Sequence, residues 1–133
     1  MNDYKVKQSL DSLGKALLRL EEAIKITHPN PLIIDGTIQR FEFVIELYWK
    51  TLKRLLAAEG IEANTPKDAL KQAFQIKWLT DETAWLQMLN DRNETSHIYN
   101  EATALRIYND IKQNYKELAA VYQKLMTLFA DKL

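Results

Sequence analysis

The side chains best suited to chemistry stand together in one stretch, Asp91-Arg92-Asn93-Glu94-Thr95-Ser96-His97-Ile98-Tyr99. Arginine is always charged, and its planar guanidinium can donate two parallel hydrogen bonds to a phosphate. Histidine, with an ordinary pKa of about 6.5, can take up or release a proton at neutral pH. This pair is enough for metal-free RNA cleavage. His97 would move the proton of the ribose 2′-hydroxyl or of the leaving 5′-oxygen, and Arg92 would stabilise charge on the phosphoryl oxygens.

The alternative to this catalytic role is that His97 is purely structural. A histidine in the last turn of a helix interacts favourably with the helix dipole. Around an unbroken helix His97 lies about 140° from Arg92, whereas Tyr99 lies about 20° from it. Arg92 and His97 therefore converge only if the helix ends or distorts near Ser96, or if a second subunit supplies the partner. A predicted helix cap at Asn100 favours the first option and places Tyr99 at a helix junction, with its phenol either exposed or packed.

Other kinds of reactive site are missing from the sequence. There is no cysteine, which excludes thiolate metal sites and Cys nucleophiles. The two histidines, His28 and His97, are far apart and lack the spacing of a metal site, so we expect no metal and no cofactor. His28 precedes Pro29 in a predicted turn and is expected at the surface. No glycine-rich phosphate loop and no G-x-S-x-G elbow is present.

The composition is that of a balanced globular domain, with 133 residues, 47% hydrophobic residues and 18 basic against 18 acidic side chains. This length predicts a single domain spanning residues 1–133. Without a basic tail or stripe, any contact with nucleic acid must be local. We expect no signal peptide and no membrane contact, because the N-terminus is polar and no apolar run could span a bilayer. The lack of cysteine is in keeping with an expected cytoplasmic location.

Apolar residues recur every three or four positions along three long stretches, which is the spacing of amphipathic helices. The three stripes are Leu10, Leu13, Leu17, Leu20 and Ile24; Ile34, Ile38, Phe41, Ile45, Tyr48, Leu52 and Leu55; and Ala104, Tyr108, Ile111, Tyr115, Leu118, Tyr122, Leu125 and Phe129. We predict an all-α fold, an up-and-down four-helix-type bundle with one additional short helix. An intermolecular coiled coil has similar spacing, but the short breaks between helices favour the intramolecular bundle.

Capping residues predict where the helices begin and end. The predicted starts are Asn30-Pro31 or, as a rival, Asp35-Gly36, then Thr65-Pro66, Thr80-Asp81-Glu82 and Asn100-Glu101. Gly60 suits the position just after the second helix, where a positive φ is wanted. The third helix is expected to end near Ile76.

One face of the second predicted helix is polar. It carries Glu42, Glu46, Lys50 and Lys53 at helical spacing. We expect a solvated face with internal salt bridges, and a binding surface is the alternative. Lys50, Lys53 and Arg54 could form a small patch that attracts phosphate. The acidic residues Asp91, Glu94 and Glu101 beside the motif oppose phosphate binding.

Two segments of the sequence resemble the HEPN superfamily and, within it, the small family of nucleotidyltransferase substrate-binding proteins. They are Arg40-Phe41-Glu42-Phe43-Val44-Ile45-Glu46-Leu47-Tyr48-Trp49-Lys50 and Arg92-Asn93-x-x-x-His97-x-Tyr99. The second segment resembles the R-x4-H-x-Y pattern of HEPN toxins, including the polar residue after the arginine, here Asn93. With the order of the helices, the resemblance covers nearly the whole chain.

This resemblance implies a helical homodimer in which two Arg92/His97 motifs face each other across a cleft. It also implies a partner, a separate minimal nucleotidyltransferase. In the toxin–antitoxin form of the pair, the HEPN protein is a metal-independent ribonuclease with Arg92 and His97 as catalytic residues and Asn93 as a supporting residue. The nucleotidyltransferase neutralises it by transferring AMP from ATP to Tyr99. The older family name implies instead a non-catalytic subunit that presents a substrate to the nucleotidyltransferase.

Overall fold

The computed structural model describes residues 3–95 and 100–133. Within these ranges it contains five α-helices and a final 3-10 turn, and no strand. They are α1 (Asp3–Ile24), α2 (Pro31–Ala58), α3 (Pro66–Gln75), α4 (Glu82–Thr95), α5 (Glu101–Leu128) and η1 (Ala130–Lys132). The prediction of an all-α bundle with one additional short helix is confirmed.

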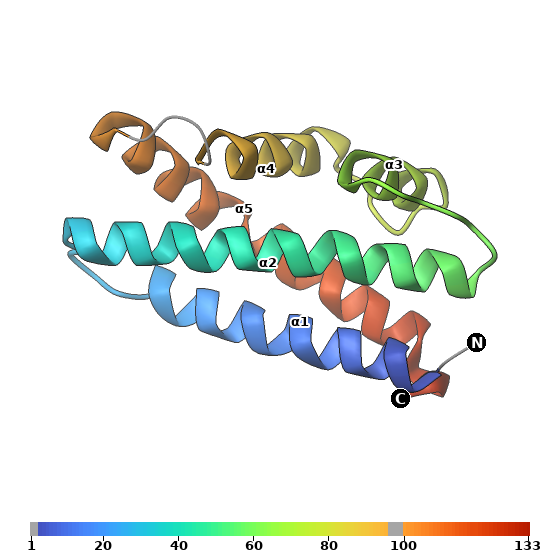
Figure 1. Ribbon diagram of the computed structural model, residues 1–133. Coiled ribbons are helices and arrows are strands. Elements are labelled where there is room, and N and C mark those ends of the chain that lie inside the picture. The colour runs from blue at the N-terminus through green and yellow to red at the C-terminus, as the bar shows by residue number, and fades with distance from the viewer. Residues whose placement is uncertain (1–2, 96–99) are drawn as a thin grey trace.

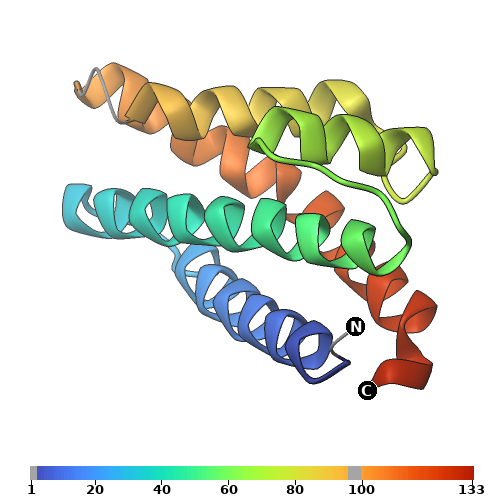
Figure 2. The ribbon, with the colours of Figure 1, turned by 45° about the vertical axis from the view of Figure 1, so that its right-hand side comes forward.

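The second helix is the centre of the bundle, because α2 packs against each of the other four α-helices. In Figure 1, α1 lies along one side of α2, and α3 and α4 lie along the other. Helix α5 crosses the bundle and contacts α1, α2 and α4. Figure 2 shows that α4 and the first turns of α5 run next to each other at one end of the molecule. No described helix is long and apolar enough to cross a membrane.

The predicted apolar stripes form the core. Phe41, Tyr48 and Leu52 of α2 are almost completely buried, as are Leu13 of α1 and Leu118 of α5. Burying such side chains is the main stabilising contribution to a domain of this size. The short helices add one large aromatic side chain to this core, because Trp85 of α4 packs edge-on against Tyr48 with a ring-centroid distance of 4.8 Å.

The helix starts follow the predicted capping residues. Side-chain oxygens of Asn30, Thr65 and Asn100 accept backbone N–H bonds from Ile33, Asp68 and Thr103 at 2.8, 3.1 and 2.8 Å. Each bond satisfies an N–H that the helix itself leaves without a partner. The rival start at Asp35-Gly36 is not used, since α2 already begins at Pro31. Gly60 has a φ of 80°, as its predicted place after α2 requires.

Three tyrosine hydroxyls connect α5 to its neighbours through backbone carbonyls. Tyr48 of α2 donates to the Leu118 carbonyl at 2.7 Å. From α5, Tyr115 donates to the Leu17 carbonyl at 3.2 Å and Tyr122 donates to the Leu10 carbonyl at 3.0 Å, both on α1. Each of these three phenol hydroxyls thus forms a hydrogen bond across a helix interface.

Two helical glycines give a matched test of this packing. A Cβ at Gly14 of α1 would overlap the phenol oxygen of Tyr122, whereas a Cβ at Gly36 of α2 would have no heavy atom within 4 Å. Alanine is favoured over glycine inside a helix by about 1 kcal/mol. Gly36→Ala should therefore raise the free energy of unfolding by about 0.5–1 kcal/mol, while Gly14→Ala should lower it. Urea denaturation measures both, and equal stabilisation by the two substitutions would contradict the close contact at Gly14.

Candidate functional site

The described part of the predicted motif lies on the last turn of α4. Arg92 is half-buried and Asn93 is exposed. The Arg92 Nη1 lies 3.4 Å from the Asn93 side-chain oxygen, a long contact that holds the two side chains loosely together. His97 and Tyr99 lie outside the described residues, so their convergence with Arg92 remains a prediction.

The guanidinium of Arg92 is directed toward α2. Its Nη2 lies 3.0 Å from Oε2 of Glu46, and both side chains are about one-third exposed, at 34% and 33%. The same Glu46 oxygen accepts the indole N–H of Trp49 at 3.1 Å, and its other oxygen lies 3.4 Å from the ammonium of Lys50. Glu46 therefore contacts one cation from another helix, Arg92 of α4, and two donors from its own helix, Trp49 and Lys50.

A second carboxylate of α2 contacts the end of α4. The hydroxyl of Thr95 lies 2.5 Å from Glu42 Oε2 and 2.8 Å from the carbonyl oxygen of Arg92. The expectation that Glu42 and Glu46 belong to a solvated face is thus wrong in part, because α4 covers the edge of that face. The predicted salt bridge between Glu46 and Lys50 is confirmed.

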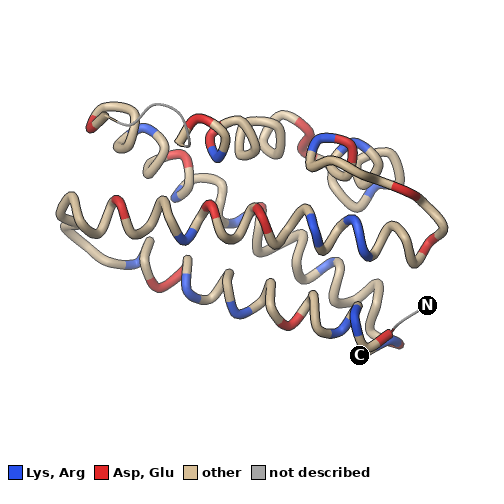
Figure 3. The backbone as a smooth tube through the Cα atoms, viewed as in Figure 1, with Lys and Arg blue, Asp and Glu red and all other residues tan. Residues whose placement is uncertain are grey.

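The alternative of a phosphate-attracting patch formed by Lys50, Lys53 and Arg54 is not favoured by their contacts. Lys50 lies against Glu46, and Arg54 of α2 is directed toward α1, where its Nη1 lies 3.3 Å from the hydroxyl of Ser9. Acidic and basic residues are interspersed along the helices (Figure 3). Lys50 and Arg54 thus face different neighbours.

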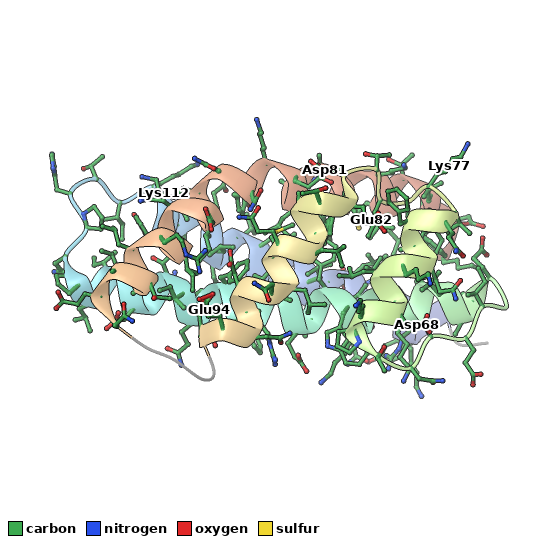
Figure 4. All side chains as sticks on the ribbon, turned by 90° about the horizontal axis from the view of Figure 1, so that it is seen from above. Asp68, Lys77, Asp81, Glu82, Glu94 and Lys112 are labelled. Atoms are coloured by element: carbon green, nitrogen blue, oxygen red, sulfur yellow. The ribbon has the colours of Figure 1, made fainter. Side chains whose placement is uncertain are left out.

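Helix α5 holds the other side of α4 through one arginine. Arg106 donates to the buried Asp91 at 3.2 Å, to both oxygens of Glu94 at 2.8 and 3.1 Å, and to Asp110 at 2.9 Å. Figure 4 shows Glu94 near the last turn of α4, beside α5. Arg106 therefore links the residues before segment 96–99 to the residues after it.

Burial has a strong electrostatic effect on Asp91. Its side chain is only 3% exposed. Desolvation raises the pKa of Asp91 to about 6, the charge of Asp110 adds to the increase, and the hydrogen bond from Arg106 opposes it. The contact with Asp91 in turn raises the pKa of Arg106. Near neutral pH the cluster thus holds a buried carboxylate that is costly to ionise.

The residues brought together here are two arginines from α4 and α5 and five carboxylates. Those carboxylates are Glu42, Glu46, Asp91, Glu94 and Asp110. Such a site can bind an anionic phosphate at the partly exposed Arg92 only in competition with its own acids. Among the residues that the structure describes, no group of three His, Asp or Glu side chains is placed to hold a metal ion.

The spacing of four residues places Glu42 and Glu46 on one polar face of a helix, as the sequence predicts, but it does not indicate their contacts with α4. Thr95 lies within the motif region, but nothing in its position indicated a partner. Arg106 was missed as well, because its partners Asp91 and Glu94 precede it by 15 and 12 positions. Only its pairing with Asp110, four residues later, has a local signal.

The raised pKa of Asp91 predicts a pH-dependent stability. Between about pH 4 and pH 6 the folded chain binds more protons at Asp91 than the unfolded chain, so the free energy of unfolding should fall as the pH rises. Asp91→Asn should remove this slope, match wild type near pH 4 and exceed it by roughly 2 kcal/mol at pH 7. Urea denaturation across this pH range measures the effect. Glu94→Gln leaves Asp91 in place and should keep the slope; a destabilised Asp91→Asn at pH 7 would contradict the prediction.

Comparison with known proteins assigns the chain to a family. The model of the family described as nucleotidyltransferase substrate binding protein like matches residues 8–127. A Haemophilus influenzae protein named probable ribonuclease HepT is 33% identical over 135 residues, covering 90% of this chain and 92% of that protein.

Two solved structures share the fold. A Thermus thermophilus protein is 32% identical, with a TM-score of 0.74, over 88% of this chain and 98% of that one. A Haemophilus influenzae protein is 27% identical, with a TM-score of 0.66, over 93% and 98% of the two chains. Its structure is described as revealing the fold of a substrate-binding domain of a nucleotidyltransferase. The resemblance inferred from the sequence is confirmed, and the chain belongs to the family of nucleotidyltransferase substrate-binding proteins.

Proposed function

We propose that this protein is a metal-independent endoribonuclease, the toxin of a toxin–antitoxin pair, with Arg92 and His97 as catalytic residues and Asn93 in support. The observation that carries the proposal is the R-x4-H-x-Y motif, with a partly exposed Arg92, in a chain 33% identical to a protein named probable ribonuclease HepT. Its partner is a separate minimal nucleotidyltransferase, in line with the family description.

The chemistry needs only a base, an acid and a cation. His97 accepts the proton of a ribose 2′-hydroxyl, and the 2′-oxygen attacks the adjacent phosphorus. The bond from phosphorus to the 5′-oxygen breaks as that oxygen receives a proton from a protonated His97 of the same or the second copy. The products are a 2′,3′-cyclic phosphate and a 5′-hydroxyl. Arg92 stabilises the negative charge that grows on the phosphoryl oxygens. In a homodimer, each site can draw these groups from both copies.

Substitution of the two catalytic residues tests this proposal. Arg92→Ala and His97→Ala should each lower cleavage of RNA in EDTA by about a hundredfold or more, because each removes one of the charge-stabilising or proton-transferring groups. Arg19→Ala is the matched control, since Arg19 is an exposed arginine on α1. Circular dichroism checks that the variants stay folded. Cleavage at the wild-type rate by both variants would assign the activity to other residues.

A second candidate function is a non-catalytic subunit that presents a substrate to the nucleotidyltransferase. The family description supports it, as does the pairing of Arg92 with Glu46 among several acids. This alternative predicts no cleavage by the wild-type protein and no growth inhibition when the protein is produced without its partner. The ribonuclease proposal predicts that the wild-type protein cleaves RNA and inhibits growth under these conditions.

We further propose that the partner nucleotidyltransferase transfers AMP from ATP to the hydroxyl of Tyr99. The phenol oxygen attacks the α-phosphorus of ATP, its proton passes to a base of the partner, and pyrophosphate leaves. A phenol with an ordinary pKa near 10 is a weak nucleophile, so the reaction depends on that partner. The added phosphate places negative charge near Arg92 and His97, where it obstructs an RNA phosphate.

Mass spectrometry of the intact protein tests this modification. Incubation with the partner, ATP and Mg²⁺ should add AMP-sized increments to wild type and none to Tyr99→Phe. Tyr4→Phe is the control, because Tyr4 is 70% exposed and lies on α1; this variant should be modified like wild type. The Tyr99→Phe protein should also remain toxic in the presence of the partner. Neutralisation of Tyr99→Phe as effective as that of wild type would show that the partner acts by binding alone.

A further inference from the structure

We infer that Glu46 is a positioning residue for Arg92, which holds the guanidinium in place in the free protein and gives it up to an RNA phosphate. The inference deepens the proposed function and rests on its assignment of Arg92 as the phosphate-binding group. Neither the motif nor the family comparison includes Glu46 among the functional residues. The contacts around its carboxylate carry the argument.

Glu46 occupies the place that a phosphate oxygen would take. Its Oε2 lies 3.0 Å from Nη2 of Arg92, the distance of a charge-assisted hydrogen bond. An RNA phosphate presents equivalent oxygens to the same guanidinium. Glu46 and the phosphate therefore compete for Arg92, and binding of one requires the other to withdraw.

The ion pair is suited to being exchanged. Both side chains are about one-third exposed, and ion pairs in such positions hold weakly because water screens them. A phosphate can accept two parallel hydrogen bonds from a guanidinium and can displace a single carboxylate contact. The pair thus orients Arg92 without binding it irreversibly.

The carboxylate keeps partners after Arg92 has turned away. The indole N–H of Trp49 lies 3.1 Å from Oε2 and the ammonium of Lys50 lies 3.4 Å from Oε1. Both donors belong to α2 and do not move with α4. Exchange therefore leaves no unpaired charge on Glu46, which would otherwise oppose RNA binding.

The neighbouring Glu42 provides a matched control. It lies one turn earlier on α2, carries the same charge and also contacts α4, but through the hydroxyl of Thr95 at 2.5 Å. Neutralising Glu42 therefore changes the local charge as neutralising Glu46 does, while the Arg92 ion pair remains.

The test measures binding of a short RNA whose 2′-hydroxyls are all methylated, so that it cannot be cleaved. At fixed salt, Glu46→Gln should lower the Kd by about three- to tenfold, and Glu42→Gln by less than about twofold. In the Arg92→Ala background, Glu46→Gln should have no effect, since a double-mutant cycle isolates an interaction between two residues. With cleavable RNA, Glu46→Gln should lower both KM and kcat, because Arg92 binds phosphate more freely but is held less well.

The outcomes distinguish failure of the positioning role of Glu46 from failure of the ribonuclease proposal. An equal decrease in Kd with and without Arg92, or an equal decrease for Glu42→Gln, would overturn the inference in favour of a general charge effect. Binding by Arg92→Ala as tight as that of wild type would also overturn it, since Arg92 would not be the phosphate group. Binding that depends on Arg92 and Glu46 without any cleavage of ordinary RNA would refute the ribonuclease proposal alone. Thermal unfolding of each variant confirms that the measured proteins are folded.

Discussion

A single helix, α2, has to bury apolar side chains against four neighbours at once, and the rest of the structure is arranged around that requirement. Its buried residues form a band that is wider than the seam of a two-stranded coiled coil. Glu42 and Glu46 lie at the edge of this band, where it meets α4. The carboxylates that contact the motif helix are thus placed by the packing of the core.

The charges around Arg92 belong to two separate helix contacts. On the α2 side, Glu46 and Glu42 bind Arg92 and Thr95. On the α5 side, Arg106 forms ion pairs with three carboxylates. One of them is the buried Asp91, which directly precedes Arg92 in the sequence. Together they fix the last turn of α4 from both sides. Under the proposed function, the same acids weaken the attraction of this site for an RNA phosphate.

The helices could be predicted from the sequence because their signals are local. Asn30, Thr65 and Asn100 cap helices through bonds to residues only three positions away, and the apolar stripes repeat within a single helix. The site was predictable only in part. The periodicity of α2 shows that Glu42 and Glu46 share a polar face, but which helix covers the edge of that face depends on tertiary packing.

The burial of Asp91 also depends on tertiary packing that the sequence of α4 does not show. As a charged residue beside an arginine, it was expected to act through its charge on the phosphate site. Its burial follows from a partner, Arg106, that lies on the next helix. The spacing of three residues from Trp85 to Met88 to Asp91 puts this carboxylate on the buried face of α4, but nothing within α4 indicates its partner. Charged residues are rarely buried without such a partner. The environment of Asp91 therefore depends on the tertiary contact between α4 and α5.

The tyrosine bonds between helices have a consequence for how the bundle can move. Apolar residues repeat so regularly along α1 and α5 that sliding one helix by a turn, about 5.4 Å, would still bring apolar side chains into contact. Tyr115 and Tyr122 each donate to one particular carbonyl of α1, and such a slide would break both bonds at once. The two phenol hydrogen bonds therefore favour one axial alignment of α1 and α5 over others that would bury a similar apolar surface. Apolar contact holds the two helices together, while two hydroxyl groups decide where along their length they meet.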